Sequence, residues 1–308
     1  MLKRLLLLGA LMIAILFEST AVCVAADPKD KNQYPEVSQS AVKIDTTVLD
    51  KTLDAQKKQK EAQKKKEEAA AKEKLQKKVA QLQKDITVNT YLKYIKQLGY
   101  YKKASKSDEK LNIRNALLLF QSNHNMSVTG TYDTATKNML VQRLSSNKFV
   151  YLDKVTKAPT KGRWITVNKT TRVLTLYEGA KVLKKYAVAV GNPASLTKSG
   201  KYIVNCKLIN PDWGGGGFAD PVKGGTPQNP LGTRWMGINR TDGSYGIHGT
   251  NSFYSIGKYI SHGCMRMSNH CVEELYSLVP MKAPVWVGTQ TELKNWSITQ
   301  PLFKQQAS

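Results

Sequence analysis

The sequence is poor in cysteine and in acidic residues. Four cysteines among 308 residues are too few for a disulfide framework. Asp and Glu number 23 against 47 Lys and Arg, so the formal net charge is +24. A chain with this charge is attracted to polyanions, among them nucleic acids, anionic membranes and anionic cell-wall polymers. Charge alone does not choose among these partners.

Long apolar runs are also scarce, and the one present predicts export. Lys3 and Arg4 precede an apolar stretch at residues 5–17, and Val24-Ala25-Ala26 then offers a cleavage site. This order is typical of a secretory signal peptide, which we place at residues 1–26. A transmembrane helix needs about 20 apolar residues, and this stretch is shorter. A retained membrane anchor is therefore the less favoured alternative, and no stable membrane span is expected. Export argues against a nucleic-acid partner.

Removal of this segment leaves three cysteines, Cys206, Cys264 and Cys271. An odd number in an exported protein means that at least one thiol is free or bonds to another molecule. A disulfide between Cys206 and Cys271 is one alternative. We favour the other, in which both are small buried side chains.

A charged helical spacer is predicted at residues 51–86. Residues 51–84 lack Gly and Pro and are mostly Lys, Gln, Glu and Ala, which are strong helix formers. We interpret the spacer as a solvated tether, with a short coiled coil as the alternative, and its lysines would be attracted to wall polyanions. The preceding residues, 27–50, are polar and expected to be disordered. The spacer's one apolar stripe at helical spacing is Leu75, Val79, Leu82 and Ile86.

A small helical domain is predicted at residues 87–146. Three short stretches carry apolar residues at helical spacing; Gly99 ends the first, and Asp133 is placed to cap the third. No catalytic constellation occurs here. His124 follows a predicted helix and is interpreted as a surface or packing residue.

Three motifs in this domain are typical of one family. They are Leu98-Gly99-Tyr100-Tyr101, Ala116-Leu117-Leu118-Leu119-Phe120-Gln121 and Val128-Thr129-Gly130-Thr131-Tyr132-Asp133. The segment therefore resembles the three-helix peptidoglycan-binding domain, and this resemblance implies contact with the glycan wall. The loop at residues 102–110 departs from the family pattern because it contains no glycine.

From residue 160 to residue 290 the pattern predicts a mainly β domain. Stretches such as Trp164-Ile165-Thr166-Val167 are rich in β-branched and aromatic residues. A glycine-rich loop at residues 210–232 is long enough to cover a site, and a helix follows with Asn269 as its expected cap. We expect a multidomain chain, in which a small all-α three-helix domain precedes a mainly β sandwich or barrel. Residues 291–308 are expected to be a tail.

Two motifs carry the catalytic chemistry. His248-Gly249-Thr250 is followed by Ser261-His262-Gly263-Cys264-Met265-Arg266. A free cysteine thiol, with a pKa of about 8.5, is mostly protonated at neutral pH. A neighbouring histidine can take its proton and later return it. The amides of Gly263 and Cys264 are candidate donors to a developing oxyanion. Arg266 is a candidate for binding a substrate carboxylate.

Two other interpretations of these motifs are less favoured. His262 and Cys264 are only two positions apart and no C-x-x-C pair follows, so the spacing is poor for zinc. A cysteine buried in a packed core is the second alternative, but Ser, His, Gly and Arg beside it are poor core residues.

The same motifs resemble the catalytic signature of the L,D-transpeptidase family. The matching residues are Ile247-His248-Gly249-Thr250, Ser261-His262-Gly263-Cys264 and, upstream, Asn229-Pro230-Leu231-Gly232-Thr233-Arg234-Trp235-Met236. Thr197-Lys198-Ser199-Gly200 departs from the usual T-P-T-G, which we expect to affect loop geometry more than chemistry.

The resemblance implies a role for each matching residue. Cys264 would be the nucleophile and His248 the acid and base, oriented by the Gly249 carbonyl. His262 and Ser261 would support the site, and Arg266 would hold it together or meet the donor peptide. Ser261, Trp235 and Tyr245 are also expected to contact substrate.

The implied reaction joins peptidoglycan stem peptides on the extracytoplasmic face of a bacterium. Cys264 would attack a tetrapeptide stem, release D-alanine and pass the acyl group to a neighbouring stem as a 3→3 cross-link. No metal or organic cofactor is implied. The alternatives are an L,D-carboxypeptidase that uses water instead of an amine, a catalytically silent wall-binding protein, and a secreted cysteine protease.

Overall fold

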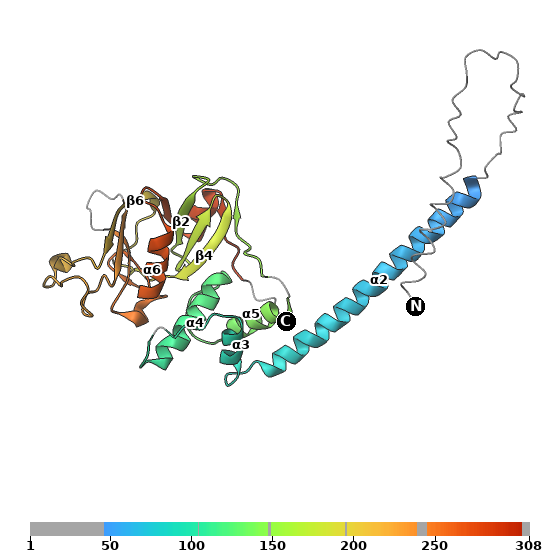
Figure 1. The fold of residues 1–308 in the computed structure, drawn as a ribbon, viewed down its shortest axis with the longest axis horizontal. Coiled ribbons are helices and arrows are strands. Elements are labelled where there is room, and N and C mark those ends of the chain that lie inside the picture. Colours follow the sequence, from blue (N-terminus) through green and yellow to red (C-terminus); the bar gives the residue numbers. More distant parts are fainter. Residues whose placement is uncertain (1–45, 104, 147–148, 195, 239–244, 304–308) are drawn as a thin grey trace, which may run out of the picture. The chain divides into compact units, whose positions relative to one another are not determined.

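The computed structural model describes residues 46–103, 105–146, 149–194, 196–238 and 245–303 (Figure 1). The predicted signal peptide, and the part of the segment predicted to be disordered up to residue 45, lie outside the described residues. The chain divides into two units, residues 1–64 and residues 65–308. The helical domain and the β domain both belong to the second unit.

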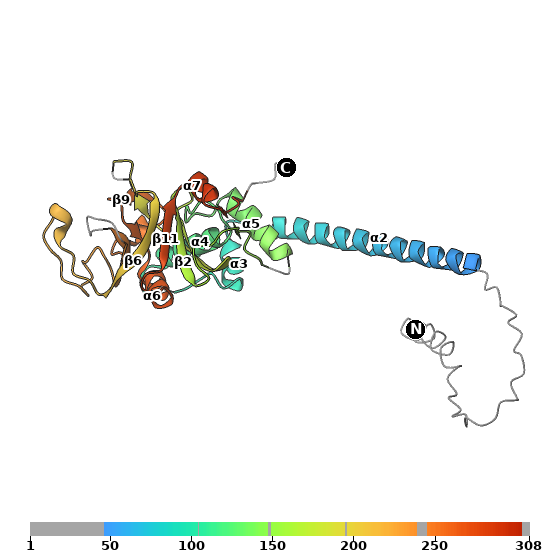
Figure 2. The same cartoon turned by 90° about the horizontal axis from the view of Figure 1, so that it is seen from above.

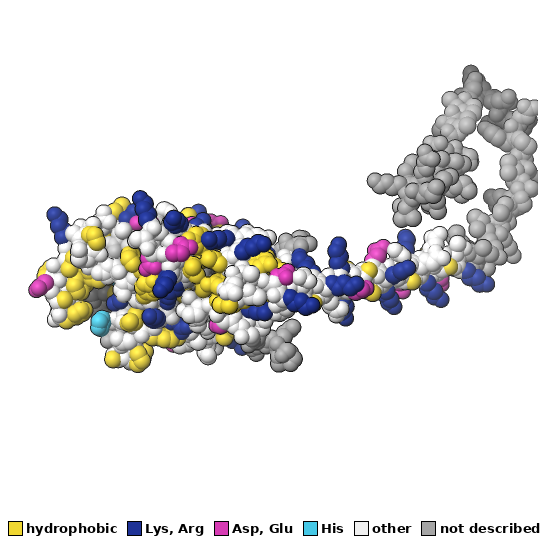
Figure 3. Space-filling model, turned by 90° about the horizontal axis from the view of Figure 1, so that it is seen from below, with side chains coloured by type: hydrophobic (Ala, Val, Ile, Leu, Met, Phe, Trp, Pro, Cys, Tyr) yellow, Lys and Arg dark blue, Asp and Glu magenta, His cyan; other side chains and the backbone are white. Residues whose placement is uncertain are grey.

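Helix α2 (Thr46–Asp85) begins before the predicted spacer and ends close to its predicted end. Residues 51–78 are exposed, and basic and acidic side chains line the helix in Figure 3. Val79 and Leu82 of the apolar stripe instead pack against the core of the helical domain, and Ile86 is buried in it. The last turns of the spacer therefore belong to that domain. Within the described ranges, no helix combines the length and the apolar character needed to cross a membrane.

The helical domain contains the three predicted helices, α3 (Tyr91–Gln97), α4 (Glu109–Asn123) and α5 (Thr134–Ser145). Asp133 caps α5 as predicted, because its carboxylate accepts the Thr136 amide at 2.7 Å. Gly99 ends the first helical segment with a φ of 79°, a conformation that favours glycine. The three helices share a core around Phe120, Ile95 and Leu140.

The β domain is built on one eight-stranded sheet in the order β10-β8-β7-β6-β11-β2-β3-β4. Neighbouring strands are antiparallel, except for the parallel pairs β10–β8 and β11–β2. Strands β6, β11 and β2 lie side by side in Figure 2. The prediction of a small helical domain followed by a mainly β domain is confirmed. The strands are β2 (Arg163–Asn168), β3 (Val173–Glu178), β4 (Lys181–Ala187), β6 (Gly200–Ile209), β7 (Arg234–Ile238), β8 (Gly246–His248), β10 (Met265–Arg266) and β11 (Pro284–Gly288).

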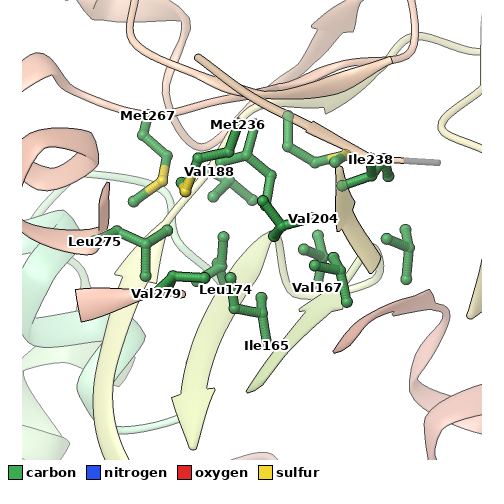
Figure 4. Packing of buried hydrophobic residues seen from close by; sticks show 14 of the residues in the cluster. Ile165, Val167, Leu174, Val188, Val204, Met236, Ile238, Met267, Leu275 and Val279 are labelled. Atoms are coloured by element: carbon green, nitrogen blue, oxygen red, sulfur yellow. The ribbon is translucent and has the colours of Figure 1, made fainter. Parts of the chain in front are cut away.

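Two short ladders, two 3-10 turns and two helices complete the domain. The ladders pair β1 (Lys154–Val155) with β12 (Ile298–Thr299) and β5 (Val190–Gly191) with β9 (Tyr259–Ser261). The turns are η1 (Gly215–Gly217) and η2 (Phe253–Ser255). Helix α6 (Asn269–Leu278) buries Val272 and Leu275 against the main core, and Figure 4 shows Leu275 beside Val279 and Met267 in that core.

The predicted C-terminal tail needs correction. Helix α7 (Gln290–Asn295) starts at a capping box formed by Thr289 and Glu292, and β12 follows it. Leu293 and Ile298 are buried in one cluster with Trp164. The β domain therefore continues past residue 290, because these side chains complete its core.

The helical domain packs directly against the β domain, with α4 beside β4 (Figure 1). Leu118 and Val128 join one buried cluster with Val173, Ala187, Ala189 and Ile256 of the β domain.

A buried polar network spans the same junction. The Lys185 ammonium donates to Asn125 Oδ1 at 2.6 Å and contacts both carboxylate oxygens of Asp153 at 2.8 and 2.7 Å. The side chains of Lys185 and Asp153 have no exposed surface. The Tyr177 hydroxyl donates to Asp153 at 2.8 Å, and the Asn125 amide donates to it at 2.9 Å. The helical domain is thereby held by the hydrogen bonds of Asn125 to this buried ion pair as well as by apolar packing.

Candidate active site

Three neighbouring strands place three of the predicted site residues in one row. Trp235 on β7 is paired with His248 on β8, and His248 is paired with Arg266 on β10. The adjacent row, Met236, Ile247 and Met265, is buried in the main core. Because successive side chains on a strand point to opposite faces, the row of Trp235, His248 and Arg266 faces away from that core.

His248 is nearly buried and held in one orientation. Its Nδ1 lies 2.6 Å from the Gly249 carbonyl oxygen, so Nδ1 carries the hydrogen in the neutral ring. The Trp235 ring stacks on it, with centroids 5.6 Å apart. Burial lowers the pKa of His248 to about 4; the Arg266 charge lowers it further, and the carbonyls of Gly249 and Leu231 oppose the shift. His248 is therefore a neutral base at neutral pH.

The turn before Cys264 is held by its own polar groups. The Ser261 hydroxyl donates to the Cys264 carbonyl at 2.6 Å and accepts the Gly263 amide at 3.2 Å. Gly263 has a φ of 121°, which a residue with a Cβ rarely adopts. This turn brings the half-buried Cys264 to the start of β10.

A cavity of about 650 Å³ opens over this row. Cys264, His248, Ser261, His262, Arg266 and Trp235 all line it.

The glycine-rich loop at residues 210–232 forms the opposite wall. It folds back on itself through backbone hydrogen bonds between Trp213 and Val222, and the exposed Phe218 ring lies 5.1 Å from the His262 ring. Asn229 holds the base of the loop, with its side-chain amide donating to the Pro211 carbonyl at 2.8 Å. The loop therefore covers the site, as its length led us to expect.

The comparisons with known proteins concern this part of the chain. Residues 162–287 match the family model of the L,D-transpeptidase catalytic domain. The Bacillus subtilis protein named "Putative L,D-transpeptidase YqjB" is 40% identical over 127 residues, which span 40% of this chain and 70% of that protein. The chain belongs to the L,D-transpeptidase family.

The chain also resembles a second Bacillus subtilis relative and a crystal structure. "Putative L,D-transpeptidase YkuD" of Bacillus subtilis is 37% identical over 116 residues, or 38% of this chain and 60% of that protein. The crystal structure of an L,D-transpeptidase from Stackebrandtia nassauensis covers 64% of this chain and 88% of its own, with 19% identity and a TM-score of 0.39.

Most of the residues predicted for the L,D-transpeptidase site meet at the cavity, but three predictions change. Tyr245 does not line the cavity; its side chain is buried in the main core, and its hydroxyl donates to the Lys198 carbonyl at 3.3 Å. The predicted oxyanion donor Gly263 already donates its amide to Ser261. Ser261, predicted to bind substrate, uses its hydroxyl within the turn.

Two residues near the site have roles that the sequence did not indicate. Asn269 was expected to cap α6, but Ser268 is the N-cap and Asn269 Oδ1 accepts the Thr250 amide at 3.0 Å. Asn269 thus fastens the segment that follows His248. Thr197 donates its hydroxyl to the Gly263 carbonyl at 2.7 Å. Neither contact follows a local pattern, because the partners are distant in sequence.

The three cysteines of the described residues form no disulfide with one another. The disulfide alternative for Cys206 and Cys271 therefore does not hold, and both side chains are half-buried where we expected them to be buried. Burial raises the pKa of Cys271 to about 11, so this thiol is a poor nucleophile at neutral pH. In the part of the chain that the structure describes, no group of His, Cys, Asp and Glu is arranged to hold a metal ion.

Proposed function

We propose that this L,D-transpeptidase cross-links peptidoglycan stem peptides through an acyl-enzyme on Cys264. The observation that carries the proposal is the shared cavity of Cys264 and His248, with His248 neutral and held by the Gly249 carbonyl. A thiol beside a neutral, oriented imidazole can transfer its proton and attack an acyl carbon. Family membership supports the same chemistry.

The reaction would proceed in two acyl transfers. His248 takes the thiol proton of Cys264, and the thiolate attacks the carbonyl of the third stem residue. When the tetrahedral intermediate collapses, the C–N bond to D-alanine breaks and His248 returns the proton to the departing amine. A side-chain amine of a second stem then attacks the thioester, loses its proton to His248, and expels the thiolate. The product is a 3→3 cross-link.

The Arg266 guanidinium supports a peptide substrate with a carboxylate. In the described part of the chain, Arg266 and the carboxylate Asp212 both line the cavity, and Arg266 is half-buried beside the Cys264 turn. Burial lowers the pKa of Arg266, but guanidinium stays charged at neutral pH. Trp235, Trp213 and Phe218 supply apolar walls. Hydrolysis of the same thioester by water remains the alternative outcome.

The test is a product analysis with a thiol-free control. We expect the mature protein, incubated with disaccharide-tetrapeptide, to form a cross-linked dimer and to gain an acyl adduct, both detected by mass spectrometry. Cys264→Ala should form neither. Tripeptide without dimer would identify a carboxypeptidase, and the absence of both products and adduct in folded protein would favour a wall-binding protein.

We further propose that the helical domain binds the glycan wall from outside the cytoplasmic membrane. The resemblance of residues 87–146 to the peptidoglycan-binding domain supports this role. Deleting the domain is a poor test, because Leu118 and Val128 would leave apolar side chains of the β domain exposed.

Salt dependence separates specific wall binding from attraction by net charge. At about 1 M NaCl the Debye length is roughly 3 Å, so attraction between the charged chain and wall polyanions is screened. We expect the mature protein to sediment with purified sacculi even then, whereas cytochrome c, a basic protein without a wall-binding domain, should be released. Release of both proteins would mean that net charge alone accounts for sedimentation with sacculi.

A further inference from the structure

The segment between β5 and β6 runs beside the turn that carries Cys264. Thr197 in this segment is only 2% exposed. Its hydroxyl donates to the Gly263 carbonyl at 2.7 Å and accepts the Gly191 amide at 2.7 Å. Both hydrogen bonds are buried, so water does not compete with them.

The segment that carries Thr197 is itself held in place by several hydrogen bonds. The Lys169 ammonium donates to the Thr197 carbonyl at 3.0 Å and to the Ser199 hydroxyl at 2.6 Å. The Ser199 hydroxyl donates to Glu292 at 2.8 Å. The buried Tyr245 donates to the carbonyl of the intervening Lys198 at 3.3 Å. A hydroxyl on so well anchored a segment is a rigid partner for the turn.

The hydrogen bond from Thr197 acts on a particular peptide plane. The Gly263 carbonyl and the Cys264 amide belong to the same peptide unit, which is planar and trans. In a trans unit the C=O and N–H bonds point in opposite directions. A carbonyl turned toward the buried Thr197 therefore directs the Cys264 N–H away from Thr197.

That direction matters because the Cys264 amide belongs to the residue that carries the nucleophile. Its N–H lies close to the carbon that the thiol would attack, where the oxyanion develops, whereas the Gly263 N–H donates to Ser261. Gly263 alone does not determine the plane, because a glycine at φ 121° has no Cβ to restrict it. A Cβ at this position would meet only ordinary contacts with Tyr245 and Leu196.

We propose that Thr197 is a positioning residue, which orients the Gly263–Cys264 peptide so that the Cys264 N–H stabilises the oxyanion. The inference rests on the proposed acyl transfer at Cys264. It assigns to Thr197 an effect on acyl transfer and none on the ionisation of the thiol.

Two reactions of Cys264 separate these effects. Acylation by p-nitrophenyl acetate passes through an oxyanion and needs no stem recognition, whereas alkylation by iodoacetamide forms none. We expect Thr197→Val to slow acylation by at least about tenfold, toward the 10²- to 10³-fold that loss of an oxyanion donor costs. The alkylation rate and its pH profile should stay within about twofold of wild type. Thr197→Ser keeps the hydroxyl and should be acylated at a rate close to that of wild type.

A matched control is Thr175→Val. Thr175 is also buried, and its hydroxyl accepts the Gln300 amide at 3.1 Å, away from the site. This variant should leave the ratio of acylation to alkylation unchanged. If Thr197→Val does not fold, Thr197→Ala replaces it with the same expectation.

An equal loss of both rates in the Thr197 variant would mean a general distortion of the turn and overturn the inference. Unchanged acylation would overturn it as well. Failure of the proposed function is seen separately, as wild-type protein that reacts with the ester but forms no adduct with tetrapeptide stems.

Discussion

Replacing His248 with asparagine should slow acylation of Cys264 by tetrapeptide about 10²- to 10⁴-fold at pH 7. Asparagine keeps a side-chain N–H for the Gly249 carbonyl but cannot accept the thiol proton. Without the base, only the small thiolate fraction of an ordinary cysteine reacts. The rate is measured as adduct formation by intact-protein mass spectrometry.

The pH dependence gives this prediction a second observable. Because burial lowers the pKa of His248 to about 4, the ring is neutral above that pH and protonated below it. The wild-type acylation rate should therefore stay constant as the pH falls through 6.5, the ordinary pKa of histidine, and should decline only near pH 4. In His248→Asn the rate should instead rise with pH as the thiolate forms.

The control for this variant is the reactivity of the thiol at high pH. Near pH 10 both proteins carry a thiolate, so iodoacetamide should alkylate them at similar rates if the variant is folded. Acylation at pH 7 that matches wild type would rule out His248 as the base.

Replacing Lys185 with methionine should lower the free energy of unfolding by about 3–5 kcal/mol. The substitution leaves the Asp153 carboxylate without its cation in a site where neither side chain has exposed surface. Burial lowers the pKa of Lys185, and the Asp153 charge opposes that shift, so each charge depends on the other. The loss is measured by urea-induced unfolding.

The adjacent lysine supplies a matched control. Lys184 pairs with Glu274, but both side chains are more than 40% exposed, so Lys184→Met should cost no more than about 1 kcal/mol. Adding Asp153→Asn to Lys185→Met should recover part of the loss, because it removes the stranded charge and keeps an oxygen acceptor. Equal losses in the free energy of unfolding for the two lysine variants would mean that the buried Lys185–Asp153 pair stabilises the fold no more than an exposed ion pair does.

Elements with strong local patterns were predicted from the sequence. The three helices of residues 87–146 followed from apolar spacing, and Asp133 caps its helix through a contact only three residues away. Strands such as β2 followed from β-branched and aromatic runs, whereas the short strands β7, β8 and β10 were not predicted. The C-terminal segment was misjudged because α7 and β12 are short, and their burial depends on a cluster with Trp164 far upstream.

In the candidate site, too, residues in local motifs were predicted and residues that depend on distant contacts were not. His248 and Cys264 were identified because they lie in short motifs whose residue types already specify nucleophile, base and tight turn. Tyr245 was misplaced because its neighbours in sequence do not reveal that its side chain faces the core. Thr197 and Asn269 were given only local roles because their partners lie 66 and 19 residues away.

The sequence by itself determined the order of the domains and the candidates for nucleophile and base, because these depend on propensities and motifs a few residues long. Only the tertiary structure decided which groups surround them. The row of Trp235, His248 and Arg266 exists because three strands pair in one register. The low pKa of His248 results from burial, and the Lys185 network results from the packing of one domain on the other. Burial and strand register are set by segments distant in the chain, so no local pattern records them.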